Sequence, residues 1–417
     1  MTDALFLDDA TTIHFFPLQK LQEDEEWLVG REETSTYVTL PGAGVEIIEL
    51  LQAQKTVGEV KAEIGAKYGQ EPEMESFLEA MLESGFIERI DGELIAPVVK
   101  ERRLFWRGLQ ARQVAWMFSL PARVFYGLTA AWVVLIWFLH PAYLPRYEDW
   151  FYHPSLTVVL LSLFALSWLQ TAWHEFWHFL AARAEGVQAD FSLGTRLLFV
   201  VAQTDVSGAW GIPRNKRYII YLAGMIGDTL LIALNLILLV LNDTGRIALP
   251  IVFYALLKAL IFGQFWGILW EFQFQMRTDV YYLIANFLNC KNLMEDSRTL
   301  LGTRLALVFA TWPLPGSWKR SWAQADLSAI PERELRSVRL YLPLYLLGTG
   351  VILANFFMRA LPVTWEYLVR SVLAITRTGG AGSGAFYDAL IFLTLTVFTT
   401  GLLFYLKWRE YRQAQRA

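Results

Sequence analysis

Runs of mostly apolar residues recur along the chain from residue 122 onward. The runs lie near residues 122–140, 155–182, 218–241, 249–271, 340–360 and 386–407. Each is close to the roughly 20 residues that a helix needs to cross the hydrocarbon core of a bilayer. The pattern predicts a mostly α, polytopic membrane domain of about six transmembrane helices over residues 122–417. A shorter apolar stretch, 300–314, is expected to lie in the membrane interface.

The first hundred residues follow a different pattern. Short strand-like runs at Trp27–Gly30 and Tyr37–Leu40 precede apolar positions at helical spacing from Val45. Thr56 and Glu59 have the spacing of a capping box, which predicts a second helix, and a third is expected over Met74–Leu82. Alternation through residues 86–94 around an Asp-Gly turn is typical of a β-wing. A winged helix-turn-helix domain is therefore predicted for 12–98, followed by a basic linker or juxtamembrane helix over 99–121.

Composition supports two differently solvated parts. Hydrophobic residues make up 55% of the chain and Trp occurs 17 times, which is more than a soluble core requires. Up to Pro97 the sequence holds 21 Asp and Glu against 6 Lys and Arg, a net charge of −15, so the remainder carries +11 of the total of −4. A domain this acidic would repel phosphates, and no nucleic-acid partner is expected. The single Cys290 excludes an internal disulfide and a Cys-based zinc site.

Lys and Arg residues next to the apolar runs predict how the chain is oriented in the membrane. They cluster before the first run, before the third and after the last, whereas loops near 141–154, 242–248 and 361–385 carry few. By the positive-inside rule, both termini are expected in the cytoplasm. Residues 1–16 open acidic and lack the basic start and apolar run of a secretory signal, which also favours a cytoplasmic first domain.

The second apolar run contains polar residues that could bind a metal ion and take part in catalysis. His174, Glu175 and His178 form an HExxH motif, and positions i and i+4 lie on one face of a helix, so both imidazoles can bind one Zn²⁺. Glu175 is then the candidate catalytic base. Chance motifs of this kind occur in soluble helices, but unpaired polar groups are costly in lipid, which favours a functional site. The other histidines lie outside the predicted core, which argues against a multi-histidine di-iron enzyme.

A third ligand cannot be chosen from spacing. The acidic residues after the motif in or near the membrane are Asp190, Asp205, Asp228, Glu271 and Asp279. Asp228 could hydrogen-bond a zinc-binding histidine or pair with an arginine.

Three stretches together resemble the site-2-protease family, and within it the peptide zinc metalloproteases that accompany peptide-modification systems. They are the HExxH helix, residues 204–210 with Leu222-Ala223-Gly224-Met225, and Met276-Arg277-Thr278-Asp279-Val280-Tyr281-Tyr282-Leu283. The resemblance implies Zn²⁺ held by His174, His178 and Asp279, with Glu271 as the alternative ligand. It also implies that Asp205 and Ser207 guide the substrate along an edge strand, although a plain re-entrant turn would fit the same residues. The expected location is the cytoplasmic membrane of a bacterium.

Residues 37–51 and 82–87 resemble PqqD-like domains, which bind the leader peptides of modification systems. The resemblance implies that residues 12–98 recruit a peptide or membrane-protein substrate, or contact partner subunits of a peptide-modification or export system. A domain that only packs against the membrane part is the other interpretation.

This chain departs from the protease pattern at three places. It has Trp177 before the second histidine, Gln273-Phe274 in place of Asn-Pro, and Val280 after the candidate ligand. A Trp at this position would narrow a substrate cleft. The Asn-Pro pair of the family is expected to help hold an extended peptide, and this chain lacks that pair. These departures leave a second hypothesis open, a non-proteolytic membrane subunit that binds a peptide or protein partner.

Overall fold

The computed structural model describes residues 8–23, 26–95, 108–197, 199–308, 330, 332–377 and 383–414. These residues are mostly helical and divide into two compact units. Unit 1 comprises residues 1–116, 179–191 and 204–220, and unit 2 comprises 117–178, 192–203 and 221–417. The first part of the linker predicted for 99–121, residues 99–107, lies outside the described residues, as do residues 309–314 of the predicted interfacial segment.

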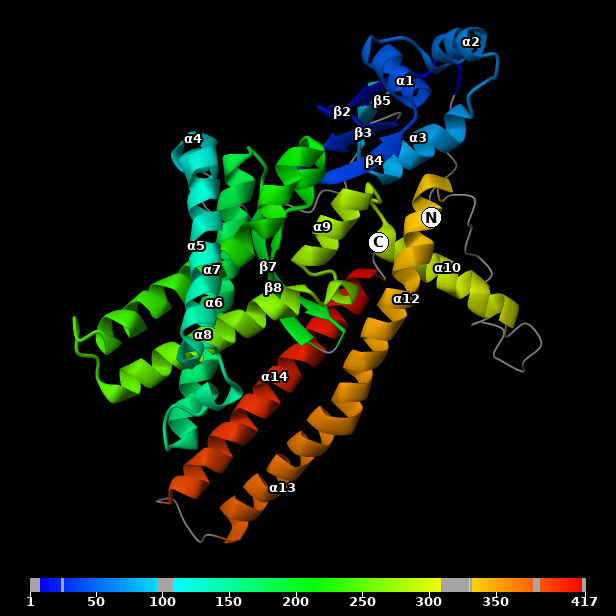
Figure 1. Ribbon diagram of the computed structural model, residues 1–417. Coiled ribbons are helices and arrows are strands. Elements are labelled where there is room, and N and C mark those ends of the chain that lie inside the picture. Colours follow the sequence, from blue (N-terminus) through cyan, green and yellow to red (C-terminus); the bar gives the residue numbers. More distant parts are fainter. Residues whose placement is uncertain are drawn as a thin grey trace. The chain divides into compact units, whose positions relative to one another are not determined.

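The N-terminal part of unit 1 contains three helices and two small antiparallel sheets (Figure 1). Its elements in chain order are β1 (Ile13–Phe15), β2 (Gln19–Glu23), β3 (Glu26–Arg31), β4 (Thr36–Leu40), α1 (Gly42–Gln52), α2 (Val57–Tyr68), α3 (Met74–Glu83), β5 (Ile87–Ile90) and β6 (Glu93–Leu94). The sheets have the strand orders β1-β5-β6 and β2-β3-β4.

Local sequence signals account for several of these boundaries. Thr56 accepts the N–H of Glu59, and the Glu59 side chain accepts the N–H of Thr56, so the predicted capping box is confirmed. Gly69 ends α2 with φ of +73°. Asp91 and Gly92 both have positive φ between β5 and β6, as a tight hairpin turn requires. The predicted strands and helices of this region are present, together with β1 and β2, which no pattern predicted. With two separate three-stranded sheets, the domain is not clearly the predicted winged helix-turn-helix.

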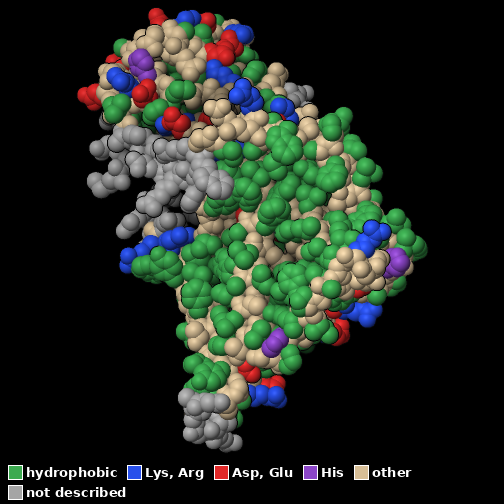
Figure 2. Space-filling model, turned by 90° about the vertical axis from the view of Figure 1, so that its left-hand side faces the viewer, with side chains coloured by type: hydrophobic (Ala, Val, Ile, Leu, Met, Phe, Trp, Pro, Cys, Tyr) green, Lys and Arg blue, Asp and Glu red, His purple; other side chains and the backbone are tan. Residues whose placement is uncertain are grey.

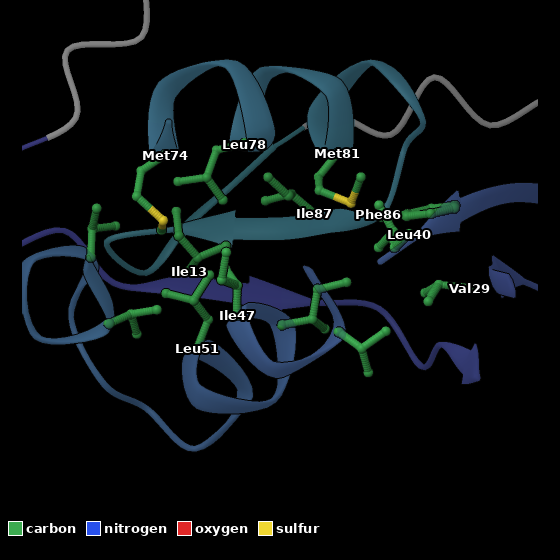
Figure 3. Packing of buried hydrophobic residues seen from close by; sticks show 14 of the residues in the cluster. Ile13, Val29, Leu40, Ile47, Leu51, Met74, Leu78, Met81, Phe86 and Ile87 are labelled. Atoms are coloured by element: carbon green, nitrogen blue, oxygen red, sulfur yellow. The ribbon is translucent and has the colours of Figure 1, made fainter. Parts of the chain in front are cut away.

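Apolar side chains of the helices and strands form one core in this domain. Figure 3 shows Met74, Leu78 and Met81 of α3 and Ile47 and Leu51 of α1 pointing toward the strands, with Ile13 and Ile87 between them. All seven are at most 5% exposed. The acidic surface predicted from composition therefore encloses a regular apolar core.

Residues 204–220 pack against this domain as part of unit 1. The 3₁₀ turn η4 (Ser207–Gly211) contacts β2, β3 and β4. Arg217 is fully buried, donates to the backbone oxygens of Ala209, Trp210 and Ile212, and forms an ion pair with Glu23 of β2. A buried guanidinium requires such partners, because each unmet donor would be costly.

Unit 2 contains most of the long helices (Figure 1). The elements that follow the N-terminal domain are α4 (Ala111–Val114), η1 (Ala115–Phe118), α5 (Leu120–Leu139), η2 (Pro141–Tyr143), η3 (Tyr147–Trp150), α6 (Leu156–Ala184), β7 (Asp190–Arg196), β8 (Phe199–Asp205), α7 (Arg214–Asp243), α8 (Ile251–Glu271), η5 (Phe274–Met276), α9 (Asp279–Leu288), α10 (Leu293–Val308), α12 (Glu332–Asn355), the π-helical turn η7 (Phe356–Ala360), α13 (Leu361–Arg377) and α14 (Gly384–Ala414).

Among the described residues, six helical stretches are long and apolar enough to cross a membrane. Each overlaps one of the six predicted runs, and the fifth, Glu332–Thr376, extends well beyond the run predicted at 340–360. Side chains such as Leu128, Phe138, Val397 and Phe404 are 66–81% exposed, which lipid would cover. Figure 2 shows hydrophobic side chains over much of the helical part of the molecule on the face that it draws. The chain is thus compatible with an integral membrane protein.

One predicted loop is wrong. Residues 361–377, placed in a connecting loop, form α13, which continues from α12 through η7 and packs along α14. The segment is amphipathic, with Glu366 and Arg370 interrupting its apolar positions. Hydropathy alone does not distinguish such a helix from a polar connection.

Candidate metal centre

The two histidines of the HExxH motif lie on successive turns of α6, and their Nε2 atoms are close together. Nε2 of His174 lies 3.1 Å from Nε2 of His178. Their side chains are 12% and 5% exposed. The α-helical spacing of four residues brings the two rings together edge to face, with centroids 4.9 Å apart and an interplanar angle of 63°.

Asp279 completes the group. Its Oδ2 lies 3.2 Å from Nε2 of His174 and 2.8 Å from Nε2 of His178. The carboxylate belongs to the first residue of α9, where the helix dipole favours negative charge. Burial by itself raises the pKa of Asp279, but the neighbouring His178 and His174 outweigh it, so the pKa lies well below its usual range. This carboxylate is therefore ionised, as a metal ligand must be.

The donor set and its spacing fit a zinc ion. Zn–N and Zn–O bonds of about 2.0–2.2 Å in a tetrahedron separate neighbouring ligand atoms by roughly 3.3 Å. The distances of 3.1 and 3.2 Å are close to this value, whereas the 2.8 Å between Asp279 and His178 is shorter. Gly224 of α7 borders the same point, since a Cβ there would lie 2.3 Å from Nε2 of His174 and 2.5 Å from Nε2 of His178. The helix thus leaves room beside both rings that any side chain would fill.

Asp228 orients His174. Its Oδ2 lies 2.7 Å from Nδ1 of His174, and the carboxylate is 5% exposed. The bond fixes Nδ1 as the protonated ring nitrogen and leaves the Nε2 lone pair for a ligand. Of the two roles considered for Asp228, the structure places it against the histidine.

Glu271, the alternative candidate ligand, hydrogen-bonds the backbone of Asp279 instead. Its Oε2 accepts the backbone N–H of Asp279 at 2.9 Å, and its backbone oxygen accepts the Thr278 hydroxyl at 2.6 Å. These bonds join the end of α8 to the start of α9 and position Asp279. Among the described residues, the ligand atoms of His174, His178 and Asp279 come together at this point, and those of Cys290, Asp296 and Glu334 form a second group elsewhere.

The remaining predicted residues lie elsewhere or on the same helix. Glu175 stands between the two histidines in α6. Asp205 ends β8, and its Oδ1 accepts the backbone N–H of Ser207 at 3.0 Å. Both belong to unit 1, whereas the metal-binding group belongs to unit 2. Their predicted role in guiding substrate stays a prediction.

Trp177 is part of the helix packing. It is 4% exposed and lies edge-on to Phe118, Tyr126 and Trp173, with ring centroids 5.7–6.0 Å apart. Gly227 makes room for it, since a Cβ there would lie 2.3 Å from the indole. The large side chain of Trp177 is thus accommodated by a glycine of α7.

Sequence reasoning missed the role of Gly224. A glycine in a transmembrane helix usually indicates close packing between helices, so nothing in the sequence marks this one as part of a site. Its proximity to two imidazoles arises from the approach of α7 to α6, which no local pattern encodes.

No protein family, curated protein or solved structure matches the chain.

Proposed function

We propose that this chain is a membrane-embedded zinc metallopeptidase of the site-2-protease type, which hydrolyses a peptide bond in a peptide or membrane-protein substrate. The observation that carries the proposal is the convergence of two Nε2 atoms and one carboxylate oxygen within an apolar helical unit. Two imidazoles and one carboxylate are the ligands of many catalytic zinc sites, which keep a further position open for water or substrate.

The residues divide the work of peptide hydrolysis among them. His174, His178 and Asp279 would hold the ion, which when bound supplies Lewis acidity and makes water a stronger acid. Glu175 would accept a proton from the attacking water and pass it to the nitrogen of the breaking C–N bond. Asp228 would keep His174 in the required tautomer, and Glu271 would hold the backbone of Asp279 in place.

The N-terminal domain is proposed to recruit the substrate in the manner of PqqD-like domains. Each outer strand of its small sheets has one edge without a strand partner among the described residues, and an extended peptide can add to such an edge through main-chain hydrogen bonds. The proposed orientation has both termini in the cytoplasm, which a reporter fused after α14 would test by its activity on that side.

Metal analysis of the purified protein is the first experiment. About one zinc per chain is expected, with loss in His174→Ala and in Asp279→Ala. His140→Ala is the matched control, because His140 is exposed and outside the group. Well-folded protein without zinc would contradict the proposal.

Catalysis needs a separate test. Membranes that contain the wild-type chain are expected to show new protein N-termini that are absent with Glu175→Gln and present with Glu366→Gln, an exposed carboxylate of α13. Identical N-termini with and without Glu175 would rule out the proposed mechanism.

One observation favours the second hypothesis, a peptide-binding subunit without catalysis. The amide oxygen of Gln273, at the position of the family's Asn, accepts a hydrogen bond from Gln275 at 3.0 Å. This amide oxygen is occupied within the chain. Zinc binding together with no Glu175-dependent cleavage would support this hypothesis.

A further inference from the structure

The hairpin of β7 and β8 is a two-stranded sheet, so each strand has one edge without a strand partner among the described residues. Such an edge presents backbone N–H and C=O groups that another strand can pair with. Leu193 and Thr195 are two residues apart in β7, so their backbone groups point to the same side of the strand.

Side chains at the C-terminal end of α14 occupy this edge. Nη2 of Arg409 donates to the backbone oxygen of Leu193 at 2.7 Å. The N–H of Thr195 donates to Oε1 of Glu410 at 3.1 Å, and its hydroxyl lies 3.0 and 2.8 Å from the two oxygens of the same carboxylate. An added strand would supply one N–H to Leu193 and one C=O to Thr195. Arg409 and Glu410 therefore supply the same donor and acceptor.

The same hairpin adjoins the candidate metal centre. Phe199 of β8 packs edge-on against Trp270 of α8, with centroids 5.0 Å apart. The next residue, Glu271, bonds the backbone of Asp279 and interacts electrostatically with Arg196 at the end of β7. A peptide paired with β7 would thus lie on the hairpin that contacts the end of α8.

We propose that the C-terminal end of α14 is a latch on the outer edge of β7, which an extended peptide displaces when it docks. This inference rests on the proposed function, because the docking peptide is the substrate. In Figure 1 the end of α14, in red, reaches the hairpin. Polar contacts suit a latch, since each is exchanged for a similar hydrogen bond to the peptide at little net cost.

A photocrosslinking experiment can detect docking without cleavage. The photoreactive residue p-benzoylphenylalanine replaces Leu193, which is 38% exposed, in the full-length Glu175→Gln chain. β-casein serves as the probe, because strand addition depends on main-chain bonds and accepts an extended chain of any sequence. In the chain with an intact latch, crosslinks are expected mainly to residues of α14.

The double variant Arg409→Ala/Glu410→Ala is expected to raise crosslinking to β-casein by about fivefold or more, the factor that corresponds to one net hydrogen bond. Glu366→Ala/Arg370→Ala removes an exposed ion pair of α13 and serves as the matched control, with no change expected. Unchanged or reduced crosslinking in the double variant would overturn the latch.

Hydrogen exchange separates a latch from a structural brace. In the double variant, Thr195 is expected to exchange faster while the amides between β7 and β8 keep their protection. Loss of protection throughout the hairpin would mean that α14 supports its fold, and would also overturn the proposal. Zinc content is measured on the same samples, so failure of the metal centre and failure of the latch are distinguished.

Discussion

Asp228 and His174 are joined across two helices by a contact of 2.7 Å between Oδ2 and Nδ1. The contact leaves Nε2 of the histidine directed toward His178 and Asp279. A buried carboxylate on a metal-binding histidine raises its basicity and fixes its ring. This pair therefore indicates how strongly the site would hold a metal.

Asp228→Asn is expected to weaken zinc binding by about tenfold to a hundredfold, because the amide cannot replace the negative charge behind His174. Competition with a chromophoric chelator measures the affinity. Asp388→Asn is the control, since Asp388 is also a partly buried carboxylate in a span and caps the start of α6 through Thr157. Equal zinc affinity in the wild-type and Asp228→Asn proteins would show that the contact has no such role.

Gly224→Ala is expected to abolish zinc binding while the protein remains folded. The new methyl group would lie within 2.5 Å of both Nε2 atoms, so the histidine rings must move. Gly267→Ala, with nothing within 4 Å of the added carbon, is the control in another span. Metal content measures zinc binding in the two variants, and thermal unfolding shows whether they are folded. Zinc retained in Gly224→Ala would show that the space beside the histidine rings is not needed.

Removal of Glu23 is expected to destabilise unit 1 by about 3 kcal/mol, since Arg217 would stay buried without its countercharge. In the cycle of Glu23→Ala, Arg217→Ala and the double variant, the double variant should cost less than the two single changes together. Lys67→Ala, which breaks the exposed pair with Glu46, should cost much less, because water screens that pair. Additive effects at Glu23 and Arg217, measured by unfolding, would contradict a direct ion pair.

Asp296 of α10 predicts a pH effect on stability. Burial and the nearby Glu334 raise the pKa of Asp296 to about 6. Because the folded pKa lies above the unfolded value of about 3.9, the charged carboxylate destabilises the fold above pH 6, and this cost is relieved as pH falls toward 4. Asp296→Asn should stabilise the chain at pH 8 by at most about 1 kcal/mol after solvent screening, with a smaller effect at pH 5.

The measurement is the shift of the unfolding midpoint between pH 5 and pH 8. Glu332→Gln removes an exposed carboxylate from the helix that carries Glu334 and should leave the pH profile unchanged. A gain for Asp296→Asn that is the same at both pH values would exclude titration of Asp296 as the cause.

Much of the fold could be predicted because its signals are local. Six apolar runs, the Thr56 capping box and the Asp91-Gly92 turn each depend on neighbouring residues. The two histidines could be paired because a helix fixes their spacing. Asp279 is 105 residues from His174, and only a resemblance, not spacing, distinguished it from the other acids.

The contacts that sequence reasoning missed are long-range. Glu23 and Arg217 are 194 residues apart, and Thr195 and Glu410 are 215 apart. No periodicity relates such residues, because the folded chain alone brings them together. The same reason explains Gly224, whose significance depends on the helix that passes beside it.

Unit 1 is assembled from three separate segments of the chain, and this has a consequence for its biogenesis. Its three stretches are separated along the chain by α5, most of α6 and the hairpin. Arg217 follows Glu23 by 194 residues, so the two can meet only after α5 and α6, which lie between them, have been synthesised. The N-terminal domain is translated before these two apolar helices, yet its packing is completed only after them.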